Sequence, residues 1–154
     1  MKTTIAMIAG LAFATAGITP AFAWHLIPES TNFTGKGTTS ATKSGVNLKC
    51  TASFTGNTDS SGVGYITGGT FTGELGCSSV TLGNLPWKSE AVGRYVVHIE
   101  NAQFNSPIGN CGPSTIATKL RNGVVSFTNA QMSGGCTVSG HVTTSPKLSI
   151  VSGD

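Results

Sequence analysis

Strict alternation of side chains along Val46–Phe54 is the feature that most constrains how this chain folds. Apolar residues occupy every second position of this stretch, and polar residues occupy the positions between them. Successive side chains of a β-strand point to opposite faces of a sheet, so the pattern is that of a strand with one buried face. A helix would instead bring apolar side chains together every three or four positions. The stretch therefore predicts a strand.

Similar short runs recur along the chain and are separated by turn-forming residues. A turn is expected at 57–62, and the Asn122-Gly123 pair suits a tight hairpin. Further strands are expected at 63–67, 69–75, 78–82, 94–101, 114–120, 124–130, 137–143 and 147–151. About eight or more short strands at this spacing predict an all-β fold, either an antiparallel β-sandwich or a barrel.

Residues 1–23 have the pattern of a secretory signal peptide. Lys2 precedes an apolar run, and Ala21-Phe22-Ala23 offers the small residues of a cleavage site. We expect this segment to be helical and to be removed, which leaves a secreted protein, extracellular or at the cell surface, without a transmembrane anchor. The alternative is an uncleaved N-terminal anchor.

The remaining residues, 24–154, have the length of one domain. Residues 24–42 differ from the rest because a few apolar residues precede a tract of Gly, Ser and Thr, and we interpret them as an N-terminal arm or edge strand before a disulfide-stapled β-domain at 43–154. Such an arm can add a strand to a neighbouring subunit. The candidate assembly residues are Trp24, Leu26, Ile27 and Phe33. The alternative is that the arm folds back on its own domain.

Four cysteines and no odd one predict two disulfides in an exported chain. Three pairings are possible. We favour Cys50 with Cys77 and Cys111 with Cys136, because each pair brackets a similar unit of strand, turn and strand. The alternative is a zinc site or a reactive thiol, for which the chain offers neither a CxxC spacing nor an adjacent His.

The charged residues are too few for most catalytic and electrostatic sites. They make up 10% of the chain, whose net charge is +3, so a nucleic-acid surface is not expected. Acidic residues form no cluster, and no sequence around a serine or glycine has the form of a nucleophile elbow or a phosphate loop. The three histidines, His25, His98 and His141, are far apart and without a motif. We therefore predict no catalytic residues, no metal and no cofactor, and a protein that is not an enzyme.

Two aromatic residues are candidates for contact with a ligand or an interface, Trp87 and Tyr65. Trp87 follows a Pro in Asn84-Leu85-Pro86-Trp87, where the ring either fills the end of the sheet or presents a flat face to a ligand. Exposure of both rings on one face would indicate a sugar-binding module. The repeated Phe-Thr-Gly, at Phe33, Phe54 and Phe71, is typical of core residues at strand ends.

Four stretches together resemble a known family. They are FTGKGTTSATKSGVNLKCTASFTG from Phe33, LPW at 85–87, NCGPS at 110–114 and GGCTVSG at 134–140, and they follow the signal peptide. This combination resembles the secreted alkane-oxidation activator proteins of proteobacteria, often called Pra proteins, over nearly all of the mature chain. The resemblance implies a small extracellular protein that helps cells to use hydrocarbons by emulsifying or contacting them, and it links the chain to biofilm surfaces. It supplies no catalytic residues.

Two hypotheses of function follow. The first is a secreted, non-enzymatic protein that promotes hydrocarbon use or emulsification at the cell surface or the oil–water interface, with a hydrocarbon or another apolar interface as its partner. The second is a subunit of an extracellular biofilm filament or adhesin, in which copies of the chain assemble by β-strand addition through residues 24–42.

Overall fold

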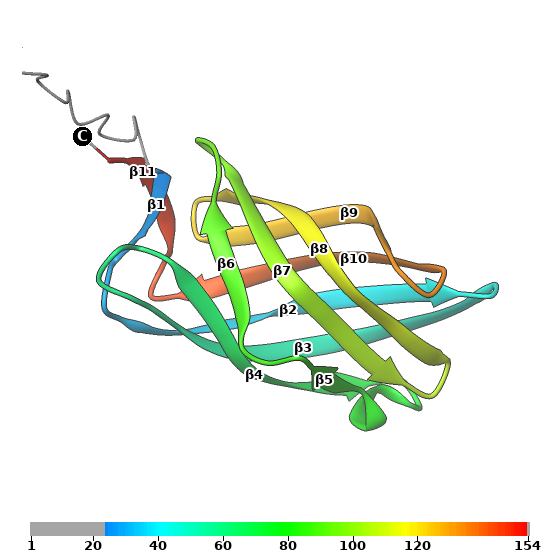
Figure 1. The fold of residues 1–154 in the computed structure, drawn as a ribbon. Helices are drawn as coiled ribbons and strands as arrows, with labels where there is room; N and C mark the ends of the chain where they lie inside the picture. Colours follow the sequence, from blue (N-terminus) through cyan, green and yellow to red (C-terminus); the bar gives the residue numbers. More distant parts are fainter. Residues whose placement is uncertain (1–23, 154) are drawn as a thin grey trace, which may run out of the picture.

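The structure, a computed structural model, describes residues 24–153, which form β-strands and one turn of 3-10 helix, η1 (Cys77–Ser79) (Figure 1). The predicted signal peptide, residues 1–23, lies outside the described residues. The strands are β1 (Trp24–Ile27), β2 (Asn32–Lys43), β3 (Val46–Thr58), β4 (Gly64–Gly73), β5 (Thr81–Gly83), β6 (Trp87–Ala91), β7 (Val96–Ser106), β8 (Gly109–Arg121), β9 (Val124–Met132), β10 (Cys136–Ser145) and β11 (Ser149–Ser152).

Eight of these strands close into an antiparallel barrel. The hydrogen-bonded order β8-β9-β10-β2-β3-β4-β6-β7 returns to its start, because β7 also pairs with β8. Closure leaves fewer unpaired sheet edges than an open sheet has. The predicted all-β fold is confirmed, and of the two expected arrangements the structure has the barrel.

The alternation read from the sequence sorts side chains between the inside and the outside of this barrel. Along β10, Val138, Val142 and Thr144 are buried, whereas His141 and Thr143 between them are exposed. An eight-stranded barrel is just wide enough for its inward side chains to fill it. Each strand therefore contributes one face to a shared apolar core.

Inward-facing glycines make room for the aromatic rings in this narrow interior. A Cβ atom at Gly56 would lie 2.6 Å from Cζ of Phe33, and one at Gly140 would lie 2.7 Å from Cζ of Phe127. Protein interiors are close-packed, so a larger residue at either position would displace a ring. Glycine at these sites is part of the core packing.

The segment 24–42 folds back on its own domain, which is the alternative to the predicted assembly arm. Trp24–Ile27 forms β1, which pairs with β11 of the same chain, and Asn32–Lys43 forms β2, which lies between β3 and β10. Leu26 and Phe33 are buried in this chain's own barrel. Two inward positions of β2 are occupied by Gly35 and Gly37, so the strand shows no alternation of apolar and polar residues in the sequence. For this reason its position between β3 and β10 was not expected.

Several predicted boundaries also shift. The strands expected at 63–67 and 69–75 are one strand, β4, and the residues expected as a strand at 78–82 form η1 and the start of β5. The sequence reading missed β6, because its period-two pattern has a serine, Ser89, at its buried centre. The expected hairpin at Asn122-Gly123 is present between β8 and β9, and both residues have positive φ.

The barrel has two distinct ends, which lie at opposite sides of Figure 1. The stapled end holds the β2–β3, β7–β8 and β9–β10 turns, η1 and two disulfides, Cys50–Cys77 and Cys111–Cys136. The favoured cysteine pairing is therefore confirmed. The ribbon end holds the β3–β4, β6–β7 and β8–β9 turns beside the two-stranded β1–β11 ribbon.

Candidate functional site

The barrel interior contains a cavity of about 80 Å³ that is lined almost entirely by apolar side chains. Most strands of the wall contribute, and the ribbon end closes over it with Leu26 from β1 and Leu148 from the segment before β11. Its other lining residues are Phe33, Gly35, Phe54, Ile66, Trp87, Ser89, Val97, Ile99, Phe104, Ile116, Leu120, Val125, Phe127, Val142 and Thr144. The cavity carries no charged side chain.

The two hydroxyls in this lining are already hydrogen-bonded. Oγ1 of Thr144 donates to the carbonyl of Gly123 at 2.7 Å and accepts from the amide of Leu148 at 3.0 Å. Oγ of Ser89 donates to the carbonyl of Trp87 at 3.5 Å. Within residues 24–153 no buried side-chain nitrogen or oxygen lacks a partner. An apolar cavity of this kind stays dry, because water would find no partners there.

Two rings separate this cavity from a second one of about 40 Å³. Phe104 and Phe127 line both cavities, and the second reaches toward the stapled end between β2, β3 and β8. Phe104 also stands edge-on to Trp87 and Phe71, with ring centroids 5.3 and 6.0 Å apart. Displacement of these two rings would join the two spaces along the barrel axis.

The predicted contact residues Trp87 and Tyr65 do not share a face. Trp87 is 2% exposed, and its Nε1 donates to the carbonyl of Gly83 at 2.7 Å. It pairs with inward Ile66, whereas the neighbouring Tyr65 pairs with Lys88 and points outward. The common aromatic face required of a sugar-binding module is therefore absent, and Trp87 is a wall residue of the cavity.

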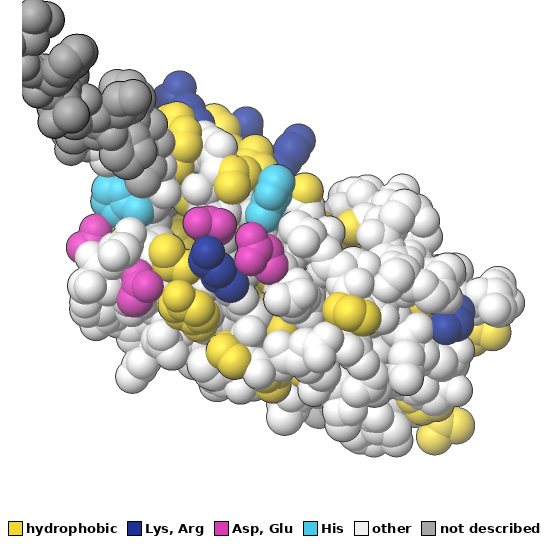
Figure 2. Space-filling view, viewed as in Figure 1, with side chains coloured by type: hydrophobic (Ala, Val, Ile, Leu, Met, Phe, Trp, Pro, Cys, Tyr) yellow, Lys and Arg dark blue, Asp and Glu magenta, His cyan; other side chains and the backbone are white. Residues whose placement is uncertain are grey.

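Three exposed apolar residues, Val46, Leu75 and Pro107, lie in or beside separate loops of the stapled end, and we call them the apolar tip. Leu75 is fully exposed and Val46 is 51% exposed. The loop of Leu75 lies against the starts of the neighbouring hairpins, since a Cβ at Gly76 would be 3.8 Å from Leu48 and 3.6 Å from Pro107. Figure 2 shows a few separate apolar side chains toward this end, whereas most of the charged side chains, and further apolar ones among them, lie toward the ribbon end. The sequence reading missed this tip, although an apolar residue in the turn-forming run Gly73–Gly76 was its signal.

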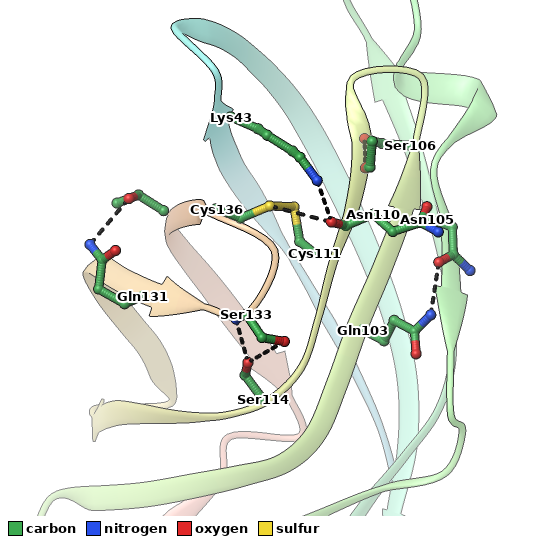
Figure 3. Close-up of a disulfide and its surroundings, with 12 residues drawn as sticks. Lys43, Gln103, Asn105, Ser106, Asn110, Cys111, Ser114, Gln131, Ser133 and Cys136 are labelled. Atoms are coloured by element: carbon green, nitrogen blue, oxygen red, sulfur yellow. Dashed lines mark hydrogen bonds between the residues drawn. A yellow bond between two sulfur atoms is a disulfide. The ribbon is translucent and has the colours of Figure 1, made fainter.

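The second disulfide and its surroundings hold the turns of the stapled end together (Figure 3). Beside Cys111–Cys136, Nζ of Lys43 donates to the carbonyl of Asn110 at 2.9 Å. The amide of Ser133 donates to Oγ of Ser114 at 2.8 Å. All four cysteines are paired, so the alternative of a zinc site or reactive thiol is wrong.

The remaining titratable residues are dispersed. Nε2 of His25 lies 3.2 Å from a carboxylate oxygen of Glu29, and Nζ of Lys88 lies 3.5 Å from one of Glu90. In the part of the chain that the structure describes, no three His, Cys, Asp or Glu side chains gather in a way that would hold a metal ion. Residues 24–153 also contain no helix with the length and apolarity that a membrane crossing requires.

Two paired disulfides indicate an oxidising compartment, because cytosolic thiols are kept reduced. A sequence model of the family described as alkane oxidation protein activator PraA/PraB-like matches residues 1–152. No curated protein and no solved structure matches the chain significantly. The resemblance carried by the cysteine motifs and the LPW turn is thus confirmed, and the chain belongs to the PraA/PraB-like family of alkane oxidation protein activators.

Proposed function

We propose that the exported protein acts without catalysis at hydrocarbon surfaces, where it adsorbs through its stapled end and makes the hydrocarbon available to the cell. Membership of the alkane oxidation activator family is the observation that carries this proposal. Hydrocarbon and water separate because apolar surface is poorly accommodated in water, so a protein that lies between them needs both apolar and charged surface.

The distribution of side chains along the barrel supports such an orientation. The apolar tip exposes Leu75, Val46 and Pro107 near Lys43 and Glu74, and the two arginines Arg94 and Arg121 lie at the ribbon end. Exposed apolar residues that gather at one place mark contact surfaces more often than scattered ones do. With the tip in oil and the ribbon end in water, Leu75 contacts hydrocarbon and the two arginines remain hydrated.

The disulfide Cys50–Cys77 supports the same role for the tip. It joins β3 to η1, directly after the loop that carries Leu75. A pre-organised apolar loop loses less conformational entropy on adsorption than a free one. The covalent link therefore favours contact with a surface that offers no specific hydrogen bonds.

Emulsification by the mature protein tests the proposal. Residues 24–154 should stabilise hexadecane droplets in buffer, and the double variant Val46→Ser, Leu75→Ser should do so severalfold less well at equal concentration. Val92→Ser is the matched control, because Val92 is 46% exposed but lies at the ribbon end. Droplets whose lifetime is the same with and without the wild-type protein would refute the proposal.

Cell growth tests the biological half of the same proposal. Cells that lack the protein should grow more slowly than wild-type cells on hexadecane but equally fast on a soluble carbon source. Mature protein added to the medium should restore growth on hexadecane. Rescue by added protein also requires that the protein works outside the cell. Rescue only by protein produced inside the cytoplasm would contradict the expected secretion.

A further inference from the structure

We infer that the barrel interior binds the end of a linear alkyl chain, which enters through a seam between β4 and β5 that the side chain of Leu82 covers. This inference deepens the proposed function and rests on it for the choice of a hydrocarbon. It adds an internal site to the contact at the outer surface.

The size of the interior cavity limits the ligand to a few carbon atoms. An engineered cavity of about 150 Å³ in another protein holds benzene, so by proportion a cavity of about 80 Å³ holds roughly three carbons. The terminal carbons of an unbranched chain fit this volume best.

The lining selects an apolar ligand. The hydroxyls of Thr144 and Ser89 already donate to backbone carbonyls, so the lining offers a polar ligand no unpaired side-chain group. A ligand with a hydroxyl, carboxylate or amine would give up its hydrogen bonds to water without replacement. An alkyl chain loses none and gains contacts with the rings of Phe54, Trp87 and Phe104.

The second cavity allows a longer chain at a cost. Phe104 and Phe127 stand between the two spaces, and the farther one of about 40 Å³ is lined by Ala41, Leu48, Phe71 and Val138 among others. A chain longer than the first cavity must displace one of these rings. Phe104 thus sets the length of chain that the wild-type interior accepts.

The seam lies where the barrel wall has no hydrogen-bonded ladder. β4 pairs with β6 only through Gly64–Ile66, and β5 pairs with β7. Among the described residues, the rest of β4, 67–73, has no strand partner on this side. β8 and β9 also pair only near their shared turn, through Lys119–Arg121. At the β4–β5 seam no ladder hydrogen bond has to break, and there the side chain of Leu82 covers the gap.

Leu82 closes this seam from β5. Its Cδ1 lies 2.9 Å from the place where a Cβ of Gly69 would be, and Cδ1 of Phe54, a lining residue, lies 2.9 Å from the same place. Gly69 therefore provides the gap that Leu82 covers, with the cavity wall directly behind it. Rotation of the leucine side chain opens a path from the outside to Phe54.

Methyl NMR of the mature protein tests the site directly. Xenon and the n-alkanes from propane to hexane are the probes. Saturable shifts are expected for the methyls of Ile66, Ile99 and Ile116, and not for those of Val92. Affinity should rise about fourfold with each added carbon that fits, from about 0.8 kcal/mol per buried methylene, and should then level off. Shifts confined to exposed methyls, or no saturation, would overturn the inference.

Three variants locate the ligand and its path. Ile116→Phe should fill the cavity and reduce alkane affinity at least tenfold. Phe104→Leu should join the two cavities and move the levelling-off to a longer chain. Leu82→Ala should speed exchange of the alkane severalfold with little change in Kd, and Val92→Ala should change neither quantity. If Ile116→Phe does not fold, the wild-type shifts and Phe104→Leu still decide the matter.

The outcomes separate this inference from the proposed function. Emulsification of hexadecane by a wild-type protein whose interior methyls never respond to alkane would leave the surface role and overturn the internal site. Binding of alkane in the interior of a protein that stabilises no droplets would support the internal site and overturn the surface role. Exchange rates that are insensitive to Leu82→Ala would overturn the seam as the path.

Discussion

The two ends of the barrel are held together by different forces. At the stapled end, Cys50–Cys77 ties β3 to η1, and Cys111–Cys136 ties β8 to β10 across β9. At the ribbon end, Leu26 and Leu148 are 2% and 4% exposed, and the barrel is closed by their burial and by hydrogen bonds, without a disulfide. One end is cross-linked around an exposed leucine, and the other is closed by buried ones.

The way in which each end is stabilised follows from whether its apolar side chains are exposed or buried. A loop that exposes Leu75 gains no stability from burying that side chain, so the neighbouring disulfide supplies the constraint. The ribbon end buries Leu26 and Leu148, and its rim combines charged and polar groups such as Arg121 with the partly exposed Val92 and Tyr95. The disulfides thus lie at the stapled end, where the exposed Leu75 adds no stability through burial.

Removal of the second disulfide should give the largest effect on stability. The double variant Cys111→Ala, Cys136→Ala opens a link of sequence separation 25, which is expected to lower the free energy of unfolding by about 3–4 kcal/mol from loop entropy. Urea unfolding, followed by the fluorescence of Trp24 and Trp87, measures it. A loss below about 1 kcal/mol would show that hydrogen bonds such as Lys43–Asn110 already hold this end.

Truncation at the ribbon end should cost nearly as much through burial. Leu26→Ala removes a fully buried side chain from the cap over the cavity, and it is expected to destabilise the fold by about 3 kcal/mol. Ile27→Ala, next to it and only half-buried, is the control and should cost clearly less. Equal losses at the two positions would mean that the ribbon is held by pairing with β11 and not by Leu26.

One hydroxyl at the ribbon end should have an intermediate effect. Thr144→Val keeps the shape of the side chain but leaves the Leu148 amide without its partner, for a cost of about 1–3 kcal/mol, whereas the Gly123 carbonyl still accepts from the Thr144 amide. Thr143→Val, one residue away on the outer face, should stay within about 0.5 kcal/mol of wild type. Hydrogen exchange of the Leu148 amide should rise in the first variant only.

The fold was predictable as far as the alternation of side chains was visible. Val46–Phe54 and β10 alternate plainly, so their strands were expected, and the cysteines bracket similar units, so their pairing was expected as well. Where glycine or serine takes the inward position, as in β2 and β6, hydrophobic alternation disappears from the sequence. The role of these strands depends on rings from neighbouring strands, which no local pattern contains.

The candidate site was less predictable for the same reason. Phe104 and Phe127 come from separate strands, and their position between two cavities follows from the closure of the barrel. The sequence left Trp87 open between core packing and contact with a ligand, and its register with the inward Ile66 places it in the core. A cavity is a property of packing, and packing is fixed by tertiary contacts that the one-dimensional pattern does not specify.

The smallest effect is expected at the charged rim of the ribbon end. The guanidinium of Arg121 lies 4.2 Å from the centre of the Tyr95 ring, and that of Arg94 lies 5.2 Å from it. Because Tyr95 is 37% exposed, water competes for both cations, and a double-mutant cycle of Arg121→Gln with Tyr95→Leu should give a coupling of about 0.5 kcal/mol. The more distant Arg94 should couple still less. A coupling above about 2 kcal/mol at Arg121 would show that the rim, and not buried Leu26 and Leu148, holds this end, and the contrast between the two ends would then fail.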